Sequence, residues 1–406
     1  MATPRRSRDK AATKAATLTA LLIGSLALTA CGSGNDETHK QSEPARGQLT
    51  TAAKSGVTAP VVATYDGGIY ILDGETLRVV DDLRLDGFNR VNPAGDERHI
   101  MVSTASGFRV LDAVGRTMTD VEFKGAKPGH VVRHAGKTAL FADGTGQVTI
   151  FDSGALGRGT PKSRTYTAPS PHHGVAVELS DGRLVVTLGN EEKRVGIAVL
   201  DKDHKEITRN ENCPGVHGEA TARGEAVVIG CQDGLLVYKD GAITKVGSPT
   251  AYGRIGTQAG SEQSPIVLGD YKKDPDAELE RPEQVSLTDT RSGTMRLVDL
   301  GPGTSYSSRS LARGPRGEAL VLGTDGRIHV IDPEAGKVVN TIPVLGTWQE
   351  PLGWQQPRPA IFVRDRTAYV SDPAAKKLHA VDIDTGRTNA TTDLPNTPNE
   401  ISGVRP

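Results

Sequence analysis

Three histidines recur at a regular interval, and each opens a stretch of similar plan. His130 is followed by Val-Val, His173 by Gly-Val-Ala and His217 by Gly-Glu-Ala. From His130 to His173 is 43 residues, and from His173 to His217 is 44. A repeat of about 40 to 45 residues is typical of the blades of a β-propeller. If each histidine opens the innermost strand of its blade, the three imidazoles lie together at one mouth of the central channel.

Three converging imidazoles would form a metal site. Neutral imidazole together with carboxylate suits Zn²⁺, and also Cu²⁺ or Ni²⁺. The candidates for a fourth ligand are water, Glu219, His172 and His134. Side chains alternate along a strand, so Glu219 is expected to face the same way as His217. His134 stands in the same relation to His130. We expect metal binding to weaken as pH falls through the histidine titration range, because protonated imidazole cannot bind a metal.

The histidines could also be a structural feature of the repeat, since some propeller families carry a structural histidine near a similar place. The other repeats of this chain have Asn89, Arg254 and Ser308 nearby instead. A histidine confined to three consecutive repeats favours a local function.

Strands that end in Asp recur along the chain and indicate an all-β propeller. We interpret each as the third strand of a four-stranded blade, with its Asp bonding the backbone N–H groups of the following turn. The strands are 69–73, 108–112, 148–152, 197–201, 328–332 and 378–382. They predict eight units, near 60–88, 89–128, 129–171, 172–215, 216–252, 253–306, 307–347 and 348–397, with seven blades as the alternative count. We predict that residues 272–283 form an exposed insertion. Residues 400–405 are predicted to form a strand that returns to the first blade and closes the ring.

Composition supports this fold class and excludes several functions. The 406 residues include 47 Gly and 24 Pro but only 4% aromatic residues, which suits many short strands and turns. A formal net charge of −1 gives no reason to expect nucleic acid or an acidic membrane surface as a partner. The chain has no GxSxG elbow, no HExxH sequence and no phosphate loop, so we do not expect an enzyme.

The first 31 residues resemble a bacterial lipoprotein signal. A basic start precedes a mostly apolar run that ends in Leu28-Thr29-Ala30-Cys31, with a small residue before the cysteine. The alternative, a transmembrane anchor, conflicts with a run shorter than the roughly 20 residues needed. We expect a signal peptide at 1–30, a disordered tether at 31–58 and a metal-binding propeller at 59–406. The protein would then be exported and lipid-anchored through Cys31 to the outer face of the cell membrane.

Cys213 and Cys231 form an even pair in an exported chain. An oxidising compartment favours a disulfide between them. The rival interpretation is that both thiolates bind metal, although their spacing is not that of a CxxC knuckle.

Several stretches resemble the AztD-type zinc metallochaperones, exported propellers that pass zinc to the solute-binding protein of an ABC importer. They are Pro128-Gly129-His130, Phe141 to Gly146, His172 to Ala176, and Cys213 to Ala220 followed by Gly230 to Gly234. The resemblance runs from about residue 60 to the C-terminus. It implies that His130, His173 and His217 bind zinc and that Cys213 and Cys231 are bridged. The His-rich N-terminal arm of that family is reduced here to His39, which puts a second zinc site in doubt.

The sequence thus leads to three hypotheses from different classes. The first is a monomeric zinc carrier that serves an ABC importer's solute-binding protein. The second is a propeller hydrolase or lyase that uses the same metal. The third is an anchored scaffold for protein interactions in which the histidines are incidental.

Overall fold

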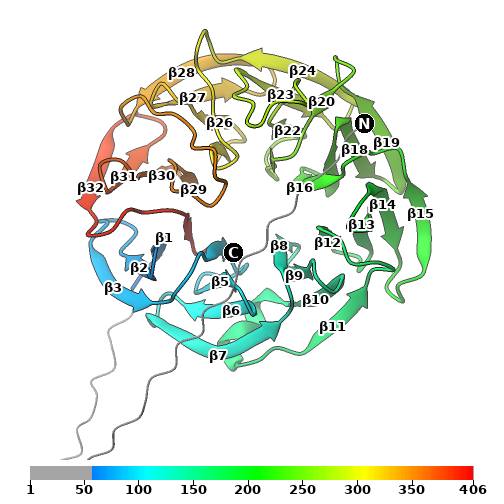
Figure 1. Ribbon diagram of the computed structural model, residues 1–406, viewed down its shortest axis with the longest axis horizontal. Helices are drawn as coiled ribbons and strands as arrows, with labels where there is room; N and C mark the ends of the chain where they lie inside the picture. Colours follow the sequence, from blue (N-terminus) through cyan, green and yellow to red (C-terminus); the bar gives the residue numbers. More distant parts are fainter. Residues whose placement is uncertain (1–56, 406) are drawn as a thin grey trace, which may run out of the picture. The chain divides into compact units, whose positions relative to one another are not determined.

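The chain folds into a ring of eight antiparallel sheets around a central channel (Figure 1). The computed structural model describes residues 57–405. The predictions that concern Cys31, His39, the signal peptide and most of the tether therefore lie outside the described residues. Within the described part, no helix is both long and apolar enough to cross a membrane.

Each sheet is one blade, and its strands run in sequence order from the channel outward, except in blade one. Blade two is β4 (Arg90–Pro93), β5 (His99–Thr104), β6 (Gly107–Asp112) and β7 (Thr117–Lys124). Blade three is β8 (Pro128–His134), β9 (Lys137–Ala142), β10 (Gln147–Asp152) and β11 (Ser163–Thr167), with a 3-10 helix over Ser153–Arg158. Blade four is β12 (Ala176–Glu178), β13 (Leu184–Gly189), β14 (Arg194–Leu200) and β15 (Glu206–Asn210).

The remaining blades follow the same plan. Blade five is β16 (His217–Ala222), β17 (Ala226–Cys231), β18 (Asp233–Lys239) and β19 (Ala242–Gly247), with β20 (Gly253–Arg254) paired to β18. Blade six is β21 (Gln258–Ala259), β22 (Ile266–Gly269), β23 (Gln284–Asp289) and β24 (Thr294–Asp299). Blade seven is β25 (Leu311–Arg313), β26 (Ala319–Leu322), β27 (Arg327–Asp332) and β28 (Lys337–Pro343). Blade eight is β29 (Ile361–Arg364), β30 (Thr367–Asp372), β31 (Lys377–Asp382) and β32 (Thr388–Asp393).

The two ends of the described chain close the ring in blade one. This blade is β33 (Ile401–Gly403), β1 (Val61–Tyr65), β2 (Gly68–Leu72) and β3 (Val79–Arg84), counted from the channel. Val61 pairs with Gly403 and Ala63 with Ile401 in an antiparallel register. The red C-terminal segment accordingly meets blue β1 in Figure 1. The prediction of eight blades closed by the C-terminal strand is confirmed, and no blade keeps an open edge at the closure.

The core lies between the blades rather than inside them. Aliphatic side chains from each pair of neighbouring sheets form a separate buried cluster, and these clusters follow one another around the ring. Valine, isoleucine and leucine supply most of this surface, which explains how so few aromatic residues suffice. Each blade is stabilised by its neighbours, as in other repeat architectures.

The turns confirm the predicted use of Asp at strand ends. Oδ1 of Asp112 accepts the backbone N–H of Gly115 at 2.6 Å, and Oδ1 of Asp332 accepts those of Glu334 and Ala335. Asp152 differs, because a 3-10 helix follows it and its carboxylate pairs with Lys137.

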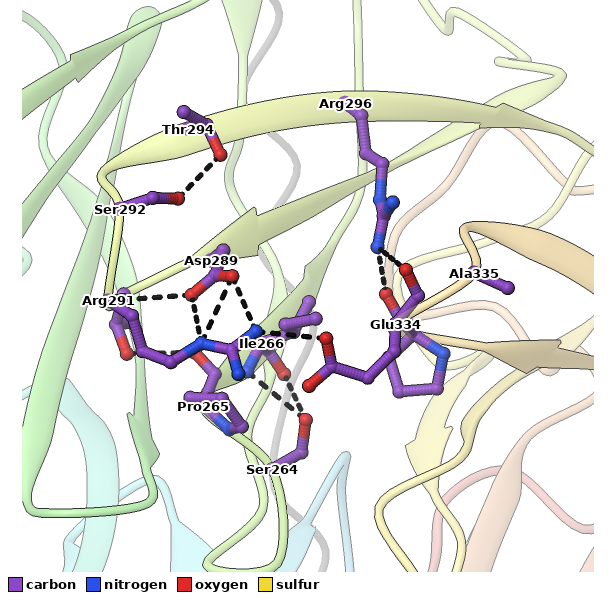
Figure 2. A network of polar contacts seen from close by, with 12 residues as sticks. Ser264, Pro265, Ile266, Asp289, Arg291, Ser292, Thr294, Arg296, Glu334 and Ala335 are labelled. Atoms are coloured by element: carbon purple, nitrogen blue, oxygen red, sulfur yellow. Dashed lines mark hydrogen bonds and ion pairs between the residues drawn. The ribbon is translucent and has the colours of Figure 1, made fainter.

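Polar contacts also tie neighbouring blades together at the rim. Figure 2 shows Arg291 of blade six, held by Asp289, reaching Oε2 of Glu334 in blade seven at 2.9 Å. Arg296 donates to the backbone carbonyl oxygen of Glu334 from the adjacent strand. Both contacts are exposed, so they orient the blades and contribute little stability individually.

Candidate metal centre

The three spaced histidines lie together at one mouth of the channel, in three consecutive blades. His130 belongs to innermost strand β8, and His217 is the first residue of innermost strand β16. His173 precedes β12 by three residues, so it lies in the entry loop rather than in the strand itself. In the described part of the chain, these residues alone form a cluster that could hold a metal ion, with one ligand atom from each within 4.8 Å of the others.

Backbone bulges shape the strands that carry two of these histidines. The register of β8 shifts between Pro128 and Val131, and that of β16 shifts between His217 and Glu219. A bulge re-aims side chains and is common beside functional sites. The regular alternation that we assumed for His217 and Glu219 therefore does not apply at this point of the strand.

The imidazole rings face one another at short range. The ring centroids of His130 and His173 are 5.0 Å apart, those of His173 and His217 are 4.9 Å apart, and those of His130 and His217 are 5.6 Å apart. Nε2 of His173 lies 3.1 Å from Nε2 of His217. The side chains of His173 and His130 are 38% and 18% exposed, so the cluster is open to an approaching partner.

An oxygen atom beside each ring determines which nitrogen carries the proton. Nδ1 of His173 donates to Oδ2 of Asp143 at 2.5 Å, and Nδ1 of His217 donates to the carbonyl oxygen of Gly256 at 2.6 Å. Nδ1 of His130 lies 3.1 Å from Oε2 of Glu219. Carboxylate and carbonyl oxygens only accept hydrogen bonds, so the proton of each neutral ring is on Nδ1. All three Nε2 lone pairs are then available to one cation, and oxygen partners of this kind are usual behind metal-binding histidines.

Electrostatics keep the cluster ready for a cation. Burial, followed by the neighbouring His130 and His173, lowers the pKa of His217 to about 2. The His217 ring is therefore neutral at physiological pH, and its Nε2 need not lose a proton before it binds a metal.

The loops behind the rings are themselves fixed in place. Asp143 also accepts the backbone N–H of Gly174 at 3.3 Å. Gly129 lets this carboxylate approach, because a Cβ there would lie 2.2 Å from Oδ1 of Asp143. Oδ1 of Asp270, a buried group whose pKa is raised by desolvation, accepts the N–H of Gly256 at 2.7 Å and holds the carbonyl group that contacts His217.

The structure separates the remaining predicted ligands from one another. Glu219 lies at the cluster through its contact with His130. His172 is 2% exposed, and its ring contacts the carbonyl oxygen of Ser170 and Oγ1 of Thr187. His134 contacts Oε1 of Glu225 at 2.8 Å, at the far end of β8. Neither His172 nor His134 is brought to the cluster.

A disulfide joins Cys213 and Cys231 next to the site, with their Cα atoms 4.9 Å apart. Both cysteines are fully buried, and His217 pairs with Gly230, the residue before Cys231. The bridge fixes the segment that enters β16 onto β17, and thereby the backbone of His217. The thiolate alternative is not realised.

The opposite mouth of the channel holds a cavity of about 1270 Å³. The far ends of the innermost strands line it, among them His134 of β8, Arg313 of β25 and Arg405 after β33. Val57, where the described chain begins, lines the same cavity. The three-histidine cluster and the start of the described chain thus lie at opposite mouths.

Comparisons with known proteins agree with this fold and these motifs. No family model matches the chain. The chain is 28% identical over 283 residues to the zinc chaperone AztD of Citrobacter koseri, and the match spans 67% of this chain and 64% of the length of that curated relative. A crystal structure of Citrobacter koseri AztD superposes with a TM-score of 0.73 at 25% identity, covering 86% of this chain and 98% of the other.

A structure of apo AztD from the same organism gives the same TM-score and coverage at 24% identity. The resemblance that the sequence motifs indicated is therefore confirmed in both sequence and fold. The curated relative is named as a chaperone rather than as an enzyme, which agrees with the lack of catalytic motifs in this sequence.

Proposed function

We propose that this protein is an extracytoplasmic zinc chaperone that binds Zn²⁺ through His130, His173 and His217 and delivers it to the solute-binding protein of an ABC importer. The observation that carries the proposal is the convergence of three imidazole rings, with one ligand nitrogen of each within 4.8 Å of the others and Nδ1 of each beside an oxygen atom. Zinc takes three imidazoles and a fourth ligand in tetrahedral geometry. The similarity to a protein named as a zinc chaperone supports this choice of metal.

The open position of the cluster suits transfer rather than permanent storage. An acceptor reaching the channel mouth can replace one histidine at a time, so the ion need never be released into water. Glu219, already beside His130, is the ligand we assign to the fourth position in the loaded state. To take that position, its carboxylate would have to leave Nδ1 of His130 and move to the Nε2 side of the ring.

Sequence features outside the described residues supply the proposed location. Cys31 ends a lipobox-like stretch, and we propose that a lipid on this cysteine holds a monomeric carrier at the outer face of the cell membrane. Mass spectrometry of the protein from its own membrane should find a diacylglyceryl group on Cys31. An unmodified N-terminal segment would refute the anchor and leave the zinc site untouched.

A competitive titration with a chromophoric zinc chelator tests the central proposal. The chain from residue 32 onward is expected to bind one zinc ion tightly, and His130→Ala, His173→Ala and His217→Ala are each expected to abolish that binding. His379→Ala, at an exposed contact with Thr391, is the matched control and should leave binding intact. Weak binding in the wild type, or unaltered binding in all three variants, would overturn the function.

A further inference from the structure

Two arginine side chains stand at the edge of the three-histidine cluster. Arg254, in β20, is two residues before Gly256, whose carbonyl oxygen holds His217. Its guanidinium lies beside that glycine, where a Cβ would be 3.1 Å from Nη2 of Arg254. Arg194 is the first residue of β14, and its backbone oxygen accepts the N–H of Gly215 in the segment that leads to His217.

Neither guanidinium has a hydrogen-bonding or ion-pair partner within residues 57–405. This is unusual for half-buried arginine, which is normally paired when it loses contact with water. The two side chains also act on each other. Burial lowers the pKa of Arg194, Arg254 lowers it further, and the nearby carboxylate of Asp143 raises it. Two like charges are thus placed together beside the cluster, with Asp143 near Arg194 and Asp270 near Arg254, but neither guanidinium forms an ion pair with these carboxylates.

The carboxylates near the two arginines are already engaged with other groups, Asp270 with the backbone N–H groups of Gly256 and Thr257. Asp143 is committed to His173 and Gly174, and Glu219 is in contact with His130. When a divalent cation joins the cluster, the two guanidiniums and the ion together exceed the charge of these three carboxylates. The loaded site therefore presents an excess of positive charge at the open channel mouth, which attracts an anion.

We propose that Arg194 and Arg254 form a carboxylate-binding subsite, through which an acidic side chain of the zinc-accepting protein docks beside the loaded cluster. The proposal rests on the zinc-carrier function given above. The guanidinium group is planar, always charged and matched to a carboxylate by paired N–H donors. A carboxylate is also a zinc ligand, so the docked group is already next to the ion that it will bind.

Transfer kinetics to two synthetic acceptors provide the test. The zinc-loaded protein is mixed at low salt with a chelator that binds zinc through several carboxylates, and separately with an uncharged polypyridyl chelator. The Arg194→Gln/Arg254→Gln variant is compared with wild type, and zinc affinity is measured for both by competitive titration. The control variant, Arg327→Gln/Arg387→Gln, removes two exposed arginines and changes the net charge equally.

The expected result is a loss of about tenfold or more in the transfer rate to the carboxylate chelator, with no loss toward the uncharged chelator. The control variant should behave as wild type, and 0.5 M salt should abolish the difference. Equal rates in variant and wild type, or equal slowing toward both chelators, would overturn the subsite. Failure of the wild type to bind zinc tightly would instead overturn the carrier function, so the two failures are distinguishable.

Discussion

Nε2 of His173 and Nε2 of His217 lie 3.1 Å apart, and neither carries a proton in the neutral rings. Each ring donates its Nδ1 proton elsewhere, to Asp143 and to the carbonyl oxygen of Gly256. Two nitrogen lone pairs at this distance repel each other unless a proton or a cation lies near both. The pair is therefore held in an arrangement that a metal ion relieves.

Asp143 should control zinc affinity without binding zinc. Asp143→Asn leaves an amide that no longer offers a charged acceptor to His173, so the ring loses both basicity and orientation. Loss of a hydrogen-bond acceptor behind a metal-binding histidine costs about 10- to 100-fold in metal affinity. A competitive titration should find a loss in this range. Asp120→Asn, at an exposed position on β7, should bind as wild type, and equal affinity in both variants would exclude the role.

Gly218 should be required for the bulge that presents His217. Its φ is +71°, and a Cβ there would meet the carbonyl oxygen of Gly256 at 2.5 Å. Gly218→Ala should cost about 1–2 kcal/mol in backbone strain and displace the oxygen that holds His217. Gly241 has a φ of +84° with nothing within 4 Å, so Gly241→Ala carries the strain without the clash. Denaturation should show both variants destabilised, whereas zinc titration should show weaker binding only for Gly218→Ala.

His172 and His173 should separate into a structural and a metal-binding residue. His172 is buried between Thr187 and Ser170, so His172→Ala should lower the free energy of unfolding by about 1–3 kcal/mol while zinc binding persists. His173→Ala should show the reverse, a small change in stability and loss of zinc. Denaturant titrations and zinc titrations of both variants would check this. Equal loss of zinc binding in the two would contradict the assignment.

Zinc-free protein should lose stability as the medium becomes acidic. The folded-state pKa of His217 is about 2, below the ordinary 6.5. Below pH 6.5 the unfolded chain therefore takes up a proton that the folded chain does not, and unfolding becomes easier as pH falls. The slope approaches about 1.4 kcal/mol per pH unit from this residue.

Urea denaturation at pH 7.5 and pH 5.5 would measure this loss. His217→Asn cannot titrate, so it should lose about 1 kcal/mol less than wild type over that interval. Equal losses in the two proteins would show that His217 does not contribute.

The disulfide should stabilise both the fold and the site. Cys213→Ala/Cys231→Ala opens a loop with a sequence separation of 18, which in the chain-entropy estimate costs about 3 kcal/mol. The variant should also bind zinc more weakly, because the segment entering β16 is no longer fixed to β17. Thermal denaturation and zinc titration would measure the two effects. A destabilised variant with wild-type affinity would show that the bridge serves stability alone.

The blade architecture was accessible from sequence because it depends on local patterns. Strands that end in Asp, such as 108–112 and 328–332, mark a fixed place in each blade, and the turn bonds from Asp112 and Asp332 give the physical reason. The closing strand at 401–403 could be predicted because an unclosed ring leaves strand edges exposed. The spacing of the three histidines also predicted their convergence, although His130 lies within β8, His173 precedes β12 and His217 begins β16.

The groups that accept hydrogen bonds from the histidines could not be predicted from the sequence in the same way. Asp143 was visible only as part of a motif, and its partnership with His173 depends on two loops of neighbouring blades. The Gly256 carbonyl has no side-chain signal at all. The glycine between His217 and Glu219 is the only sequence signal of the bulge. The prediction of regular alternation did not take it into account.

The separation of the histidine cluster from Val57, at opposite mouths of the channel, has a mechanical consequence. Any attachment made through the residues before Val57 joins the ring at one mouth of the channel, while the bound ion lies at the other. The cluster is built by blades three, four and five alone, so rotation of the ring about its axis carries the ion with those blades. A receiver therefore has to match both the tilt of the ring and its rotation about the axis before it reaches the ion.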